Sequence, residues 1–328
     1  MAVSAVKTSV WITSFILFTG LGSTVWWIQA HQIPAVPTIA FIPQAGGEML
    51  SEIGHFGATT AAEGLKCRLY WNAPTSETDV PGQVSLVDRI ARGKYQGLVL
   101  APNHPFAILA PLQRVLALGV PVVVISAPLD IPSNSKFGYV VNDDERMGEL
   151  AATEVARLIH GRGAIVLVGV ARYVPGVMLR ARGAERVLAN QFPGIRVVSR
   201  LGAASNADRA EELSTSVLAS HPSLNAFLSL TAISTRGVHA ALKNRSSLHA
   251  IHLVGCEQDS DLVGYVESGE IAAVMAENVY RMGYEAVGLI AASWGGKPIP
   301  SRTVVPPLMI TKQNFNSAET RLFVNFPR

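Results

Sequence analysis

Short apolar runs alternate with longer amphipathic segments along most of the chain. From Thr38 onward the apolar runs are nearly continuous, which is typical of strands buried on both faces of a parallel sheet. The strands predicted from them span 38–42, 66–71, 97–101, 120–126, 164–168, 196–201, 226–230, 251–255, 271–276 and 302–311. The helices predicted between them span 49–64, 81–92, 105–117, 143–159, 176–190, 207–219, 233–243, 259–268 and 279–294. This alternation predicts an α/β fold with helices on both faces of parallel sheets.

The number of strands favours two sheets over one. So many strands exceed what one compact open sheet usually holds. A single (β/α) barrel is the alternative, but its regular strand rhythm is missing. The predicted fold is therefore two doubly wound parallel-sheet lobes. Because ligands bind beyond the carboxyl ends of strands in open α/β sheets, we expect a ligand cleft between the lobes.

One uncharged apolar stretch precedes these lobes. Val10–Ile28 follows Lys7 and predicts an N-terminal hydrophobic helix. It is either a signal peptide or an uncleaved signal anchor, and both export the rest of the chain. Its length and the pair Trp26 and Trp27 favour the anchor, because tryptophans suit a membrane–water boundary. Residues 1–30 are predicted to be this segment and residues 31–37 a linker.

Charge and motifs exclude several classes of protein. The 328 residues carry a formal charge of only +3 and no long basic run, so nucleic acid is not an expected partner. Cys67 and Cys256 lie in or beside apolar runs, as buried small side chains do. The chain lacks nucleotide-binding glycine loops, a nucleophile elbow and metal-ligand histidine spacing. We therefore expect no enzymatic activity and no cofactor.

Several short sequence motifs follow one another along the chain in a characteristic order. They are Thr38-Ile-Ala-Phe-Ile, Gly119-Val-Pro-Val-Val-Val, Asn142-Asp-Asp-Glu-Arg-Met-Gly-Glu-Leu-Ala, Arg180-Ala-Arg-Gly, Asn225-Ala-Phe-Leu, Leu253-Val-Gly-Cys-Glu and Gly269-Glu-Ile-Ala-Ala-Val. With these phrases the chain resembles the ribose- and galactose-type periplasmic sugar-binding proteins. The same core forms the effector domain of lac-repressor-type regulators, but no DNA-reading module precedes it here.

The resemblance implies a type I periplasmic binding protein fold with strand exchange between lobes. The first lobe would take 38–126 plus about 275–314, the second about 127–274, and 315–328 would form a tail. It implies an exported solute-binding protein that closes on a small polar, sugar-like ligand for ABC-type import. The alternative is a membrane-anchored sensor acting on a signalling partner. The expected partners are an ABC permease or a membrane sensor. The expected location is periplasmic or otherwise extracytoplasmic, with an inner-membrane anchor if the N-terminal segment stays uncleaved.

The resemblance also places candidate ligand contacts in the loops at strand ends. They are Glu48, Asn103, Ser126, Asp143, Tyr173, Arg180, Thr231, Glu257, Glu277 and Asn278. Arg180 matches a family arginine that bonds ligand oxygens, with Arg182 as the alternative. Asp143 also reads as a helix cap.

This chain departs from the family pattern at several of these positions. Glu48, Leu50 and Ser51 stand where the family often has Asn and two Phe, and Ser126-Ala127 replaces an Asp-Arg pair. Thr231-Ala232 replaces Asn-Asp, Glu257 an Asp, and Glu277 a Gln. Tyr173 is a candidate for the missing aromatic face. The acidic residues Glu48, Glu257 and Glu277 would also accept an amino or otherwise cationic ligand.

Overall fold

The computed structural model describes residues 36–126, 129–244 and 251–324. The predicted N-terminal helix and most of the linker lie outside these residues. Within the described ranges, no helix combines the length and the apolar character that crossing a membrane requires.

Strands and helices follow one another along the described chain as an α/β fold requires. The strands are β1 (Thr38–Ile42), β2 (Arg68–Trp71), β3 (Gly97–Leu100), β4 (Val122–Ile125), β5 (Phe137–Asn142), β6 (Gly163–Val168), β7 (Ile195–Leu201), β8 (Leu224–Ser229), β9 (His252–Cys256), β10 (Ala273–Ala276), β11 (Arg302–Val305) and β12 (Leu308–Thr311). The helices are α2 (Met49–Gly64), α3 (Val80–Arg92), α4 (Leu109–Ala117), α5 (Asp144–Leu158), α6 (Pro175–Gln191), α7 (Ala207–Ser220), α8 (Ala232–Asn244), α9 (Ser260–Ser268), α10 (Val279–Trp294) and α11 (Ala318–Val324).

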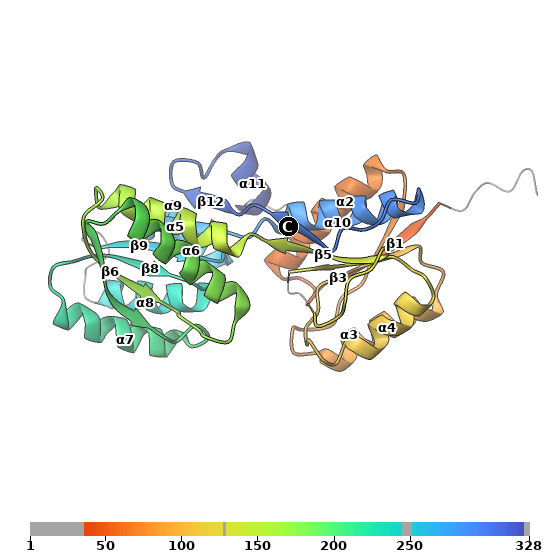
Figure 1. The fold of residues 1–328 in the computed structure, drawn as a ribbon, viewed down its shortest axis with the longest axis horizontal. Coiled ribbons are helices and arrows are strands. Elements are labelled where there is room, and N and C mark those ends of the chain that lie inside the picture. Colours follow the sequence, from red (N-terminus) through yellow and green to blue (C-terminus); the bar gives the residue numbers. More distant parts are fainter. Residues whose placement is uncertain (1–35, 127–128, 245–250, 325–328) are drawn as a thin grey trace, which may run out of the picture. The chain divides into compact units, whose positions relative to one another are not determined.

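The strands form two six-stranded sheets, as the predicted fold class required (Figure 1). The first has the order β11-β5-β4-β3-β1-β2 and the second β12-β10-β9-β8-β6-β7. All neighbours are parallel except β10 and β12, which pair antiparallel. In Figure 1, α2 and α10 lie on one side of the first sheet, and α3 and α4 lie on the other. The two-lobe α/β prediction is confirmed.

Each sheet is sandwiched between two separate apolar layers. In the first lobe, Ile53 of α2 packs with Met282 of α10 on one face, while Leu112 of α4 belongs to the layer on the other face. In the second lobe, Val155 of α5 and Val238 of α8 belong to opposite layers in the same way. Burial of both faces explains why the strands read as continuous apolar runs.

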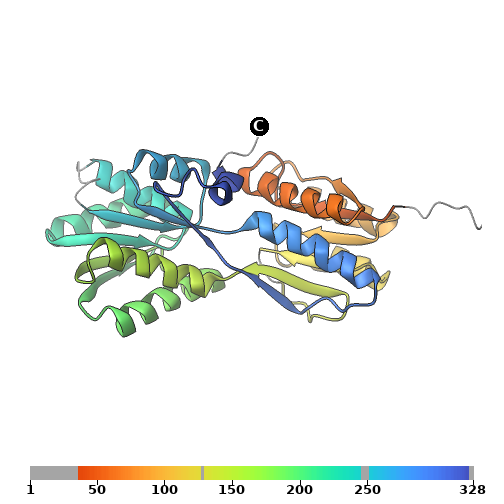
Figure 2. The ribbon, with the colours of Figure 1, turned by 90° about the horizontal axis from the view of Figure 1, so that it is seen from above.

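The chain passes between the sheets three times, and two of these crossings differ from the sequence prediction (Figure 2). Strand β5, which the sequence analysis missed, pairs with β4 and β11 in the first sheet. The predicted start of the second lobe at about 127 is therefore wrong, and that lobe begins with α5. The second crossing joins β10 of the second sheet to α10 of the first lobe.

The third crossing splits the segment predicted as one strand over 302–311. Its first half, β11, pairs with β5, and its second half, β12, pairs with β10 in the other sheet. Pro306 and Pro307 separate the two halves. Proline has no backbone N–H to donate and interrupts a strand, so this pair is suited to the point where the chain changes sheets. The predicted assignment of residues up to 314 to the first lobe is corrected accordingly.

Glycines allow helices in both lobes to pack at backbone distance. A Cβ added to Gly148 of α5 would collide with the carbonyl oxygen of Arg180 in α6, and one added to Gly183 with that of Glu145. In the first lobe a Cβ on Gly57 would meet the carbonyl oxygen of Tyr280 in the same way. The close approach of α5 and α6 sets the position of Arg180 beside the start of α5.

We expect Gly148→Ala to destabilise the protein by about 1–3 kcal/mol, because the added methyl group must push α5 and α6 apart. The matched control is Gly288→Ala in α10, where a Cβ meets no atom within 4 Å. That change should stabilise the protein by about 0.5–1 kcal/mol, since alanine is the better helix former. Denaturant unfolding of both variants is the measurement. Equal effects would contradict the assigned helix contact.

Candidate functional site

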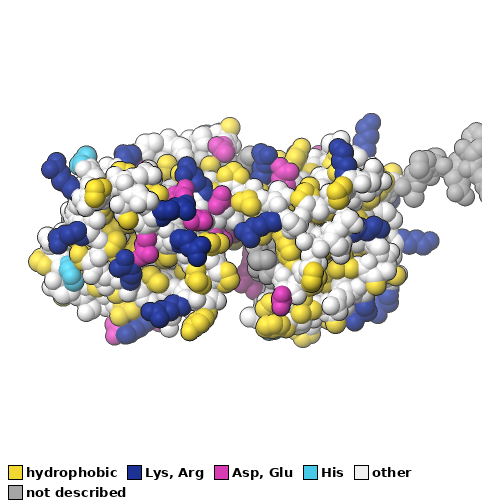
Figure 3. Space-filling model, in the orientation of Figure 1, with side chains coloured by type: hydrophobic (Ala, Val, Ile, Leu, Met, Phe, Trp, Pro, Cys, Tyr) yellow, Lys and Arg dark blue, Asp and Glu magenta, His cyan; other side chains and the backbone are white. Residues whose placement is uncertain are grey.

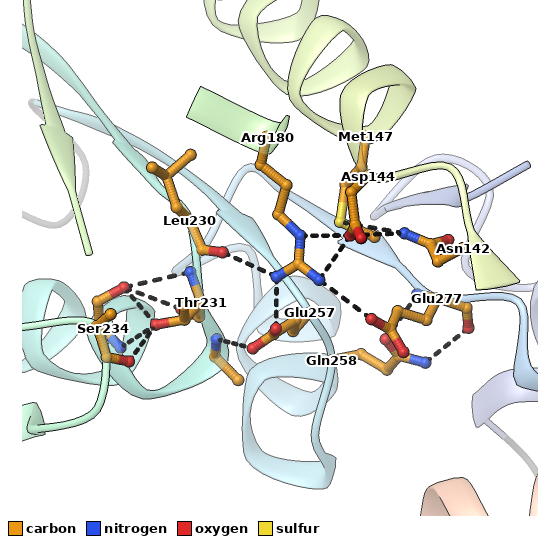
Figure 4. A network of polar contacts seen from close by, with 12 residues as sticks. Asn142, Asp144, Met147, Arg180, Leu230, Thr231, Ser234, Glu257, Gln258 and Glu277 are labelled. Atoms are coloured by element: carbon orange, nitrogen blue, oxygen red, sulfur yellow. Dashed lines mark hydrogen bonds and ion pairs between the residues drawn. The ribbon is translucent and has the colours of Figure 1, made fainter. Parts of the chain in front are cut away.

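A buried arginine organises the carboxyl ends of the strands in the second sheet (Figure 4). Arg180 is only 3% exposed. Its Nε donates to Asp144 Oδ1 at 2.8 Å, and Nη2 lies 2.8 Å from the same oxygen. Nη1 donates to the carbonyl oxygen of Leu230 at 3.0 Å and to Glu257 Oε1, while Nη2 donates to Glu277 Oε1 at 3.1 Å. Four N–H groups of the guanidinium therefore donate to protein oxygens, and Nη2 also lies within ion-pair distance of Asp144.

The three carboxylates come from separate parts of the second lobe. Asp144 is the first residue of α5, Glu257 follows β9, and Glu277 follows β10. Parallel strands end at the same edge of a sheet, so residues that follow neighbouring strands lie close together. Glu257 has a φ of 64°, a left-handed conformation unusual for a side chain of this kind, which marks a constrained position.

Backbone and side-chain bonds fix two of these carboxylates further. Glu257 Oε2 accepts from the backbone N–H of Ala232 at 3.0 Å, at the start of α8, where a helix favours negative charge. Gln258 donates from Nε2 to the carbonyl oxygen of Glu277 at 3.0 Å, and its Oε1 accepts from the Glu277 N–H at 2.9 Å. Gln258 is buried and thus positions Glu277.

One guanidinium does not neutralise three carboxylates. The pKa of Glu277 is raised to about 7: burial is the main cause, Arg180 opposes it, and Glu257 and Asp144 add to it. Burial disfavours the charge of Arg180, but Glu257, Asp144 and Glu277 outweigh it and raise its pKa. Burial also raises the pKa of the neighbouring Cys256 thiol to about 12, so this cysteine is a protonated, buried side chain.

A small cavity adjoins this cluster on the side of Glu277. Its volume is about 90 Å³. It is lined largely by residues at the carboxyl ends of β1, β3 and β4 and at the start of α2: Phe41, Pro43, Gln44, Leu50, Ser51, Gly54, Ala101, Ile125, Ser126, Glu277 and Val279. Strand ends of the first sheet and Glu277 therefore share one cavity, whose wall is mostly apolar.

The structure brings some of the predicted contacts together. Arg180, Glu257 and Glu277 form the cluster, and Ser126 and Glu277 line the cavity. Arg182, the alternative to Arg180, is exposed and lies apart from the carboxylates along the same helix.

Other predicted contacts are engaged in local structure. Asp143 Oδ1 and Asn278 Oδ1 each cap a helix, accepting at 3.0 Å from the N–H groups of Arg146 and Arg281. The hydroxyl of Thr231 is buried and donates to the carbonyl oxygen of Ala204 at 2.7 Å. These three side chains serve the fold of the loops in which they lie.

The remaining three candidates lie away from the cluster. Asn103 is held by buried Gln83, which donates from Nε2 to the Asn103 Oδ1 at 3.3 Å and accepts from its N–H at 2.8 Å. Glu48 is exposed before α2, and its pKa is raised by burial and by Glu77. Tyr173 is 95% exposed, so this state of the protein does not use it as an aromatic face.

Sequence reasoning missed Asp144, Gln258 and Gln83. Asp144 stands beside Asp143: Asp143 caps the helix, which was one of its two predicted roles, while Asp144, which had none, reaches Arg180. The signal was present in the Asn142-Asp-Asp phrase, but the spacing alone does not say which carboxylate turns inward. Among the described residues no group of three or more His, Cys, Asp or Glu side chains could hold a metal ion.

The outer face over α5 and α6 carries charges of both signs (Figure 3). Arg186 pairs with Glu145 and Glu149, and Arg146 pairs with Glu149 at 2.8 Å. Acidic and basic side chains lie side by side on this face, and such a mixed surface does not resemble the one-sided basic footprint of a nucleic-acid-binding face.

The fold and the cluster define a two-lobed α/β binding protein, and comparisons with known proteins agree. The profile of the periplasmic binding protein domain family matches residues 39–298, so the chain belongs to this family. The D-allose-binding periplasmic protein of Escherichia coli (strain K12) is 24% identical over 236 residues, covering 70% of this chain and 75% of that protein.

Two solved structures share the fold. AraP, an arabinose-binding protein from Geobacillus stearothermophilus, has a TM-score of 0.78 at 19% identity, covering 86% of this chain and 98% of that one. A chain from the XylFII–LytSN complex has a TM-score of 0.73 at 20% identity, covering 86% and 100%. Family membership confirms the predicted resemblance, the assignment to binding proteins and not enzymes, and an extracytoplasmic location.

We expect Arg180→Ala to destabilise the protein by about 3–5 kcal/mol, because three carboxylates would be left without their cation. The loss should shrink at acidic pH, where protonation relieves the repulsion. Arg182→Ala, two residues along the same helix, is the control and should change stability by no more than about 0.5 kcal/mol. The measurement is denaturant unfolding of both variants at neutral and at acidic pH. Equal losses of stability in the two variants would contradict the assigned role of Arg180 in the cluster.

The Glu277 carboxyl should make stability depend on pH. Its pKa is about 7 in the folded protein against an ordinary 4.5, so the folded state holds a proton that the unfolded state releases. The stability from that proton is complete below about pH 4.5 and is lost as the pH rises through about 7. The side chain of the Glu277→Gln variant is neutral at every pH. The stability of this variant relative to the wild type should therefore rise between pH 5 and 8, by at most about 3 kcal/mol.

Thermal unfolding of both proteins across this pH range tests the Glu277 assignment. Because all other titrating groups are shared, the difference between the two curves isolates this carboxyl. Parallel curves would show that Glu277 has an ordinary pKa.

Proposed function

We propose that the chain is an exported solute-binding protein whose lobes close on a small polyhydroxylated, sugar-like ligand for ABC-type import. The observation that carries the proposal is the cluster itself. Glu257 and Glu277 are held as hydrogen-bond acceptors at the strand ends of the second sheet, and Glu277 also lines the cavity formed by the strand ends of the first.

The chemistry of this arrangement suits a polyol. Ionised carboxylates accept hydrogen bonds and bind neighbouring hydroxyl groups well. Phe41, Leu50 and Ile125 in the cavity wall offer apolar surface to the carbon skeleton of such a ligand. The relatives support the same ligand class, since one is named for D-allose and another for arabinose.

Both lobes contribute to the proposed site, so ligand binding would favour a closed arrangement. Three chain segments connect the sheets, and hinges of this kind absorb small backbone rotations while each lobe stays rigid. The proposed contacts from this chain are Ser126, Glu257 and Glu277, with Tyr173 available to the closed state because its ring is free on the surface. A closed form would present a distinct surface to a permease.

A sensory role is the second candidate. The uncharged stretch Val10–Ile28 suits an uncleaved anchor, and one structural relative was solved as a XylFII–LytSN complex. A tethered binding protein that reports its ligand to a membrane partner would use the same closure. The mass of the mature protein distinguishes the cases: a cleaved N-terminus favours free diffusion to a permease, and an intact one favours a tethered protein.

Neutral polyols should bind the purified full-length chain. The probes are D-allose, D-arabinose, D-tagatose and xylitol, alongside the amino sugars D-glucosamine and D-galactosamine. A ligand that binds only the folded state stabilises it by about 2.7 kcal/mol at a hundredfold excess over its Kd. We expect such a thermal shift with a decrease in the radius of gyration, both lost in Glu257→Gln and kept in Arg182→Ala. The absence of any shift across the set would contradict a sugar-binding function.

A further inference from the structure

The role of Arg180 in the proposed site differs from that of a ligand-binding arginine. Four of its five N–H groups already donate to oxygens of Asp144, Leu230, Glu257 and Glu277, and Nη2 also lies 2.8 Å from Asp144 Oδ1. A ligand oxygen would have to compete with these four acceptors for the guanidinium. Arg180 is therefore a positioning residue, and the atoms it presents to a ligand are the oxygens of its carboxylate partners.

These carboxylates carry more negative charge than the protein neutralises. With all three ionised, Arg180 leaves two negative charges uncompensated, and no other Lys or Arg in the described part of the chain pairs with them. Glu257 has an additional donor in the N–H of Ala232. Glu277 has no such donor: its Oε1 is bonded to Arg180, and its Oε2 has no hydrogen-bond partner among the described residues.

The uncompensated charge lies at the cavity. Glu277 is the one acidic residue in the cavity wall, and the rest of that wall is apolar or uncharged. A negative charge with apolar surroundings attracts a cation more strongly than it would in water, because the effective dielectric constant is lower. The raised pKa of Glu277 agrees with this imbalance, since the carboxyl takes up a proton when no cation is present.

From this geometry we propose that the site selects a ligand carrying an ammonium group, such as an amino sugar or another amino polyol. Glu277 would pair with the ammonium group, and Glu257 would accept from neighbouring hydroxyls. The inference rests on the proposed solute-binding function and adds the charge of its ligand. Glu48, the third acidic position singled out in the sequence, has no part in it because it lies beside Glu77.

The same geometry disfavours sugar acids and sugar phosphates. An anionic group would meet three carboxylates and an arginine that already pairs with all of them. A neutral sugar is the competing case, in which Glu277 stays protonated and donates a hydrogen bond. The two cases predict opposite orders of affinity for an amino sugar and its parent sugar.

The test is titration calorimetry on the full-length chain at neutral pH with matched pairs. The probes are D-glucosamine and D-glucose, D-galactosamine and D-galactose, and D-mannosamine and D-mannose, with D-glucuronate as the anion. We expect at least one amino sugar to bind ten times or more tighter than its parent, and D-glucuronate not to bind. In Glu277→Gln this preference should vanish while the parent sugar binds as before or better.

Glu285→Gln, at a half-buried position in α10 where the side chain pairs with Arg281, is the matched control and should keep the preference. Parent sugars that bind as tightly as the amino sugars would overturn the ammonium inference and leave the solute-binding proposal standing. Equal weakening of both ligand classes by Glu277→Gln would give this residue a merely structural role and also overturn it. If neither these probes nor the neutral polyols bind, both proposals fail.

Discussion

The buried guanidinium of Arg180 is the interaction on which the ligand end of the second lobe depends. It holds three carboxylates that would otherwise repel one another at the ends of α5, β9 and β10. Burying an ion pair brings little net stability, because desolvation offsets the Coulomb attraction. The value of such a cluster lies in its geometry: it fixes acceptor oxygens in place before a ligand arrives, so binding need not order them.

The packing around Arg180 explains how this geometry is maintained. Its helix lies against α5 at backbone distance, because Gly148 and Gly183 leave no side chain between them. Gln258 and the N–H of Ala232 then fix Glu277 and Glu257 from the opposite side. The cluster is thus held by two packed helices and by strand-end residues whose side chains and backbone are hydrogen-bonded, and a site that must discriminate between similar polar molecules requires such fixed geometry.

The sequence reveals the fold more fully than the site. Continuous apolar runs and helix-length segments predict nearly every element, since burial of both sheet faces dictates that pattern. Strand β5 escapes because its short run contains Gly138 and because it follows a segment rich in Pro, Ser and Asn. The site depends on which way single side chains turn, as Asp143 and Asp144 show. The periodicity of apolar residues does not show in which direction a polar side chain points. Only the resemblance to a family indicated Arg180, Glu257 and Glu277.

The change of sheet between β11 and β12 affects how the chain folds during synthesis. Each sheet receives an edge strand from this last stretch, so the first sheet has all its strands only after Val305 has been made and the second only after Thr311. Domains that fold as independent units can complete themselves one after another as the chain emerges. Here the first lobe lacks α10 and β11 until nearly the whole chain has been synthesised, so the two lobes become complete at almost the same time. A ribosome-bound fragment would therefore hold two incomplete sheets, and truncation near the C-terminus would damage both lobes at once.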